Sequence, residues 1–234
     1  MENETQEKKW QPIGRVQRRV LGVLVEKAKT TPASYPMTLN AIAVASNQKS
    51  NRSPQMQLDV DDVDAELDNL RELGAVVEVQ GDGRKSKYKH RMYEWLGVDK
   101  VELAVMAELL LRGQQTLGDL RARASRMEKI EGQSELKPIV QGLIARGLII
   151  ELTPPGRGQI VTHGLYQPEE LPKLERQIAS SGADDTTVNS ESSSVGGARS
   201  VEPSLADSKQ IEELKKSVEL LTERVARLEE KLQT

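Results

Sequence analysis

Residues 70–85, LRELGAVVEVQGDGRK, recur in altered form 73 residues further on as LIARGLIIELTPPGRG, residues 143–158. Each copy ends a helix, passes through a glycine, Gly74 or Gly147, and continues as a β-branched run into a turn that contains glycine. The same shift aligns His90 with His163. We infer an internal duplication in which each copy builds one small unit of helices and strands.

Three helices are expected before each hairpin. In the first copy, apolar residues spaced by three and four predict a helix that ends near Lys29, a short helix capped by Thr38, and a third helix over about 61–73. In the second copy they predict helices over about 99–112, 117–124 and 134–146. Three helices followed by two strands is the order of a winged helix-turn-helix. The second strand of the first hairpin is expected to run through KSKYKHRMY, residues 85–93.

The predicted fold class is therefore mainly α with small β-hairpins (α+β). It comprises two tandem winged helix-turn-helix domains, residues 15–97 and 98–172, plus a C-terminal coiled-coil helix, residues 209–234. The polar residues 1–14 are expected to be disordered, and residues 173–208, rich in Ser, Gly, Asp and Thr, to form a flexible linker.

A heptad pattern in the last segment favours a parallel homodimer, with β-branched residues at most a positions and leucine at the d positions. The candidate dimerisation residues are Ile211, Leu214, Val218, Leu221, Val225, Leu228 and Leu232. The alternative is a single amphipathic helix that docks on the body.

Composition excludes several classes of site. The chain of 234 residues has no cysteine, two histidines and a formal net charge of −3. These features argue against disulfides, zinc fingers, thiol nucleophiles and a protein that coats nucleic acid through overall positive charge. No phosphate loop, nucleophile elbow or metal-spaced carboxylate set is found, so we expect no enzyme, cofactor or metal. No apolar run approaches the ~18 residues of a membrane span, which predicts a cytoplasmic protein without membrane contact.

Local basic patches are candidates for nucleic-acid binding, because lysine and arginine side chains neutralise backbone phosphates. The loop NQKSNRSP, residues 47–54, contributes Lys49, Asn51 and Arg52; the first wing contributes Arg84, Lys85, Lys87, Lys89 and Arg91; the second copy contributes Arg121, Arg123 and Arg126. The alternatives are a structural loop held by its own turns, and a wing whose lysines protect a sheet edge.

The third helix of the first copy argues against reading of the major groove. Residues 59–72 hold seven acidic side chains against Arg71 alone, and phosphates would be repelled. His90 and His163 stand at equivalent places on the wings, so we expect a shared structural hydrogen bond there.

Three segments resemble the YceH-like family of bacterial proteins of uncharacterised function: RVLGVLVEKAKTTPASYPMTLNAI (19–42), NQKSNRSPQM (47–56) and LLLRGQQTLGDLRARASRM (109–127). The resemblance covers about residues 15–166 and implies a tandem winged-helix fold, with no established activity, ligand or partner.

Two functions are consistent with the sequence. The first is a non-enzymatic DNA-binding or transcription-regulatory factor that contacts double-stranded DNA through the loop and the first wing. The second is a protein-interaction adaptor that binds a partner through the acidic third helix and gains bivalency from the coiled coil.

Overall fold

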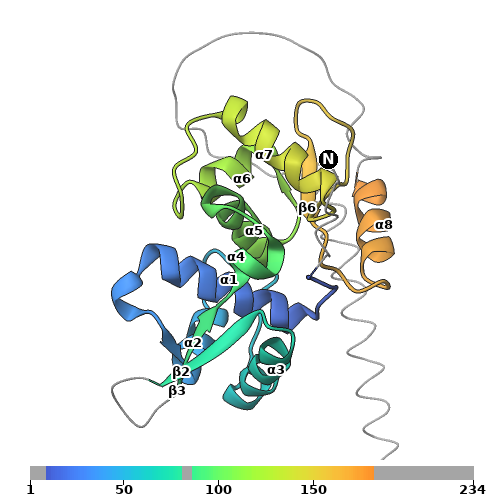
Figure 1. Ribbon diagram of the computed structural model, residues 1–234. Helices are drawn as coiled ribbons and strands as arrows, with labels where there is room; N and C mark the ends of the chain where they lie inside the picture. Colours follow the sequence, from blue (N-terminus) through green and yellow to red (C-terminus); the bar gives the residue numbers. More distant parts are fainter. Residues whose placement is uncertain (1–8, 81–85, 182–234) are drawn as a thin grey trace, which may run out of the picture. The chain divides into compact units, whose positions relative to one another are not determined.

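A computed structural model describes residues 9–80 and 86–181 of the chain (Figure 1). The first copy contains α1 (Arg15–Thr30), η1 (Pro32–Ser34), β1 (Met37–Thr38), α2 (Leu39–Ser46), α3 (Val60–Glu72), β2 (Val76–Gln80), β3 (Ser86–His90) and α4 (Met92–Leu96). The second contains α5 (Lys100–Arg112), β4 (Gln115–Thr116), α6 (Leu117–Ala124), α7 (Gln133–Ala145), β5 (Ile149–Glu151) and β6 (Ile160–His163), and α8 (Leu171–Ser181) follows. The α+β class is confirmed.

The two copies share strand order and register. Their antiparallel sheets run β1-β3-β2 and β4-β6-β5. Val76 pairs with His90 in one sheet, and Ile149 pairs with His163 in the other, which are the same positions shifted by 73 residues. Gly74 and Gly147 end the preceding helices with φ angles of 72° and 71°, a backbone region that glycine enters without steric cost. The repeat found in the sequence therefore corresponds to a repeat in space.

Short polar signals place the helix starts. The hydroxyl of Thr38 accepts a hydrogen bond from Ala41 N, and the hydroxyl of Thr116 accepts one from Asp119 N, so equivalent threonines cap α2 and α6. The same threonines end β1 and β4, strands of two residues that are too short to show a period of two. The expected extension of the wing strand to residue 93 is wrong: β3 ends at His90, and α4 begins at Met92.

One continuous hydrophobic core joins the copies, because α1 and α5 pack against each other more extensively than any other pair of elements. Residues 103–111 of α5 are all buried. Gly22 makes the close approach possible: a Cβ atom there would lie 2.8 Å from Leu111 Cγ and 3.3 Å from the carbonyl oxygen of Ala107. The interface between the copies is thus part of the core.

Two expectations at the ends of the body need correction. Residues 1–14 are not disordered throughout, since Trp10 and Ile13 are buried and Ile13 N donates to Leu165 O at 3.1 Å. The predicted linker begins later than residue 173, because α8 continues to Ser181. Residues 209–234, with every candidate dimerisation residue, lie outside the described part of the chain. Within the described residues, no helix is both long enough and apolar enough to cross a bilayer.

Candidate functional site

Arg52 of the 47–54 loop is buried, and its side chain is not available to DNA phosphates. Its side chain has 0% exposure and forms an ion pair with Glu26 of α1, with Nη2 2.6 Å from Oε2 and Nη1 3.2 Å from Oε1. Its remaining hydrogen bonds go to Ala45 O, Gln48 Oε1 and Asn51 O. All five acceptors belong to the protein, so the nucleic-acid assignment of Arg52 is wrong. The Arg52 side chain is held inside because the buried carboxylate of Glu26 needs a positively charged partner.

The same loop ties the first copy to the second. Ser53 N donates to Leu111 O at the end of α5, at 3.0 Å. The guanidinium of Arg19 donates to Ser46 O, Pro54 O and Leu111 O, at 2.9, 2.7 and 3.4 Å. Helices end with carbonyl groups that lack intrahelical partners, and Arg19 satisfies such groups on α2 and α5 together. The loop, which has no counterpart in the second copy, therefore acts as a structural bridge; Asn51 lies within it at a φ of 58°.

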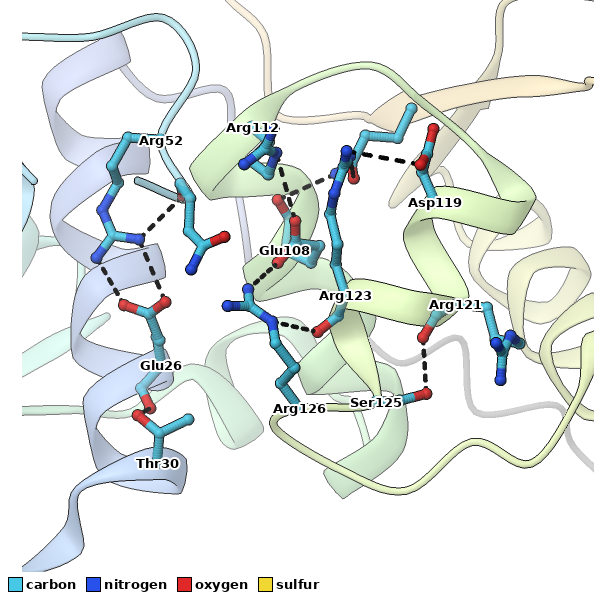
Figure 2. Close-up of polar contacts among 12 residues, drawn as sticks. Glu26, Thr30, Arg52, Glu108, Arg112, Asp119, Arg121, Arg123, Ser125 and Arg126 are labelled. Carbon is cyan, nitrogen blue, oxygen red and sulfur yellow. Dashed lines mark hydrogen bonds and ion pairs between the residues drawn. The ribbon is translucent and has the colours of Figure 1, made fainter. Parts of the chain in front are cut away.

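Glu108 carries a second buried charge at the contact of α1 and α5. Its side chain has 0% exposure, with Arg126 Nη2 3.4 Å from Oε2 and Arg112 Nε 3.8 Å from Oε1 (Figure 2). Burial raises the pKa of this carboxyl group, and the three nearby arginines, Arg126 foremost, oppose the rise. Because the Glu108 carboxylate is buried and faces arginines rather than an open cavity, we assign this cluster a structural role.

The arginines of the second copy make contacts within the protein. Arg123 donates to Gln115 Oε1 at 2.6 Å and lies 3.5 Å from Asp119. Arg121 lies 3.4 Å from the carbonyl oxygens of Ile130 and Glu131, and Arg126 pairs with Glu108. Figure 2 shows the contacts of Arg123 with Asp119 and of Arg126 with Glu108. Their capacity to bind phosphate is correspondingly reduced.

The first wing and Lys49 keep part of their predicted exposure. Lys49, Lys89 and Arg91 are exposed, whereas Lys87 is half-buried. Arg84 and Lys85 lie outside the described residues. Of the described basic candidates, the exposed ones are thus Lys49 of the loop, Lys89 and Arg91 at the end of the wing, and Arg126 of the second copy, whose side chain is 42% exposed although it pairs with Glu108.

The outward side of α3 is strongly acidic. Its exposed face presents Asp61, Asp64, Asp68 and Glu72, at helical spacings of three and four. Asp59 and Asp62 form a capping box, which accounts for two further acids. Arg71 is paired with Asp68 at 2.8 Å and with Glu78 at 3.1 Å, so it offsets one of the four acids, and Asp61, Asp64 and Glu72 remain. The face repels phosphate and attracts cations.

The two histidines have the predicted structural role. His90 Nδ1 accepts from Met92 N and His163 Nδ1 accepts from Leu165 N, both at 3.3 Å. Burial lowers the pKa of His90 to about 4 and lowers that of His163 well below its ordinary value. Both rings are thus neutral acceptors that fix the chain after each wing. Among the described residues, no group of His, Asp or Glu side chains could hold a metal ion.

Three residues of α1 that hold the core together were not among the predicted site residues. Arg19, Gly22 and Glu26 recur at helical spacing on one side of α1, and this arginine–glycine–glutamate stripe is the signal that could have identified the contact with α5 and the loop. A basic cleft lined by Arg15, Arg112 and Lys173, which come from three separate elements, was not predicted either.

Comparisons with known proteins give relatives without an assigned role. A family model described as "Protein of unknown function, DUF480" matches residues 13–157. A UPF0502 protein of Rhodopirellula baltica is 53% identical over 186 residues, which cover 78% of each chain. A UPF0502 protein of Koribacter versatilis is 40% identical over 178 residues, or 73% of this chain and 82% of the relative. A third, from Pelobacter propionicus, is 47% identical over 135 residues, or 58% and 62% of the two chains.

Proposed function

Because this chain belongs to the DUF480 (UPF0502) family of uncharacterised proteins, its role has to be argued from its own surfaces, and we propose that it is a non-enzymatic adaptor with two winged-helix units that binds a basic protein partner. The YceH-like resemblance and the repeated order of three helices and a hairpin support the winged-helix assignment. The acidic face of α3 supports the choice of partner.

The position of that face carries the proposal. In helix-turn-helix proteins that read DNA, the recognition helix lies in the major groove beside two rows of phosphates. Here the corresponding helix presents Asp61, Asp64, Asp68 and Glu72 to solvent. A surface rich in lysine or arginine complements this stripe, and such complementarity mainly raises the association rate and the specificity.

Neutralising the stripe tests the proposal. We would compare the full chain with a variant that carries Asp61→Asn, Asp64→Asn and Asp68→Asn, using cross-linking and mass spectrometry in cells of the natural host. A matched control carries Glu94→Gln, Glu169→Gln and Glu175→Gln, three exposed acids outside α3. Cross-linked proteins that are retained by the control and lost by the α3 variant would support the adaptor function. An unchanged set of cross-links in the α3 variant would contradict it.

DNA binding through the first wing is the second candidate, and the exposure of Lys49, Lys89 and Arg91 favours it. Fluorescence anisotropy with a mixed-sequence duplex tests it at low and at physiological salt. Wing-mediated binding should weaken steeply with salt, and Lys89→Ala with Arg91→Ala should flatten that dependence, because each phosphate contact contributes to the slope. Absence of binding at low salt would remove this candidate and leave the adaptor function.

A further inference from the structure

A cleft of about 740 Å³ lies where α1, the end of α5, the 47–54 loop with Met56, the end of β6 and α8 meet. Its volume is in the range of small-molecule sites, about 300–1,000 Å³. Its charged lining residues are Arg15, Arg18, Arg19, Arg112, Lys173 and Glu170. Of the described residues that line it, Glu170 alone is acidic. The cleft therefore carries a marked excess of positive charge in a protein whose net charge is −3.

The single carboxylate is already neutralised. Arg18 forms a bidentate pair with Glu170, with Nη1 and Nη2 each 2.7 Å from a carboxylate oxygen. The hydrogen bond from Arg18 lowers the pKa of Glu170, so the carboxylate stays ionised and the pair stays closed at neutral pH. This pair joins α1 to the residue that directly precedes α8. The charge of Glu170 also interacts with Arg15, but one carboxylate offsets only one of the five cations that line the cleft.

The positive charges of the other cations are only partly neutralised by neighbouring groups of the protein. Arg19 donates to three main-chain carbonyl oxygens, which carry no formal charge, and burial together with nearby Arg52 and Arg15 lowers the pKa of Arg19 to about 10. Arg112 shares the buried carboxylate of Glu108 with Arg126. Arg15 and Lys173 are exposed at the rim. Together these groups create a positive electrostatic potential in the cleft, which favours the binding of an anion.

Apolar groups also line the cleft. Met56, Leu174 and the ring of Tyr166 line it, and the Tyr166 hydroxyl is held by Thr162 at 2.9 Å. The guanidinium carbon of Arg18 lies over that ring, 4.9 Å from its centre, in a cation–π contact. His163 adds no charge, because burial keeps its ring neutral. Cationic groups and apolar groups that line the same cleft match a ligand with an anionic group and an organic portion.

We propose that this cleft binds a small organophosphate, with its phosphate groups between Arg15, Arg112 and Lys173 and its organic portion against Met56 and Tyr166. Guanidinium groups present paired donors that match phosphate oxygens, and lysine adds a compact point charge. No residue of α3 lines the cleft, so binding of the organophosphate and binding of the protein partner can be tested independently.

Isothermal titration calorimetry on the full chain tests the proposal at physiological salt, with pyrophosphate and a panel of nucleotides and sugar phosphates as probes. Pyrophosphate should bind, and at least one organophosphate should bind more tightly. Arg15→Gln with Lys173→Gln should weaken both by about tenfold or more, since each removes a charge-assisted contact. Both side chains are exposed, so the core should remain intact. Lys129→Gln with Lys137→Gln removes the same charge outside the cleft and should leave affinity unchanged.

Three results would overturn the assignment. The first is the absence of binding by pyrophosphate and by every member of the panel at millimolar concentration. The second is binding that survives in the Arg15→Gln, Lys173→Gln variant. The third is an affinity for pyrophosphate that equals or exceeds that of every organophosphate, which would remove the role assigned to Met56 and Tyr166.

Discussion

Replacing Arg52 with alanine should lower the free energy of unfolding by about 3–5 kcal/mol, the range for breaking a buried ion pair. Two observations support this magnitude. The Arg52 side chain has 0% exposure, and Glu26 is 8% exposed, so the remaining carboxylate would have little access to water. The guanidinium also makes three hydrogen bonds beyond the pair, with Ala45 O, Gln48 Oε1 and Asn51 O. For a chain of this size the loss corresponds to a fall in Tm of roughly 6–20 °C.

Urea unfolding followed by far-UV circular dichroism would measure the change, with a constant m value as the sign that only stability has altered. Lys49→Ala is the matched control, because Lys49 is exposed on the same loop and should change stability by less than about 0.5 kcal/mol. Glu26→Leu combined with Arg52→Met should recover most of the lost stability, since neither charge is then buried. An Arg52→Ala protein as stable as Lys49→Ala would refute the reasoning, and Arg52 would again be a candidate for surface contacts.

Three further predictions follow from the core and the ends of the chain. Gly22→Val should destabilise by about 1–3 kcal/mol through overpacking, and Leu111→Ala in the same chain should cost less than its effect alone, which a double-mutant cycle in urea would detect; strict additivity would contradict close packing. Between pH 6.5 and about 4 the histidine at position 90 binds a proton in the unfolded chain but not in the folded protein, so stability should decrease as the pH is lowered, by up to about 1.4 kcal/mol per pH unit; the lowered pKa of His163 acts in the same direction. His90→Asn should reduce the slope of the urea midpoint against pH, whereas an unchanged slope would argue for solvent access to His90. Deleting residues 209–234 should convert a dimer to a monomer by light scattering without unfolding the body, and a dimer that persists would place the interface elsewhere.

Local signals predicted the repeated hairpins well, because each rests on a β-branched run next to a glycine whose positive φ ends a helix. The threonine cap of α2 could also be predicted from neighbouring residues, and the equivalent threonine caps α6 in the second copy. The interpretation of the 47–54 loop failed for a different reason. Its residues are those of a solvated loop, and only the partner of Arg52, 26 positions earlier on α1, shows that the side chain is buried.

The basic cleft could not have been predicted from the sequence either. The three cations assigned to the phosphate groups, Arg15, Arg112 and Lys173, come from α1, α5 and α8, and only the tertiary structure brings them together. Arg15 belongs to the arginine-rich run RVQRR, residues 15–19, but nothing in the sequence links that run to Arg112 or Lys173. Tertiary structure decides such a site, whereas the acids of α3 share one helix and could be recognised from their spacing alone.

The contact of α1 with α5 sets an order of events during synthesis on the ribosome. The N-terminal copy emerges first, yet Gly22 and the neighbouring surface of α1 have no packing partner until α5, which ends at Arg112, has left the exit tunnel. The hydrogen bond between Ile13 and Leu165 forms later still. The nascent chain must therefore keep its first copy incomplete through most of translation, and a ribosome stalled before Arg112 would hold a chain with an exposed apolar helix face.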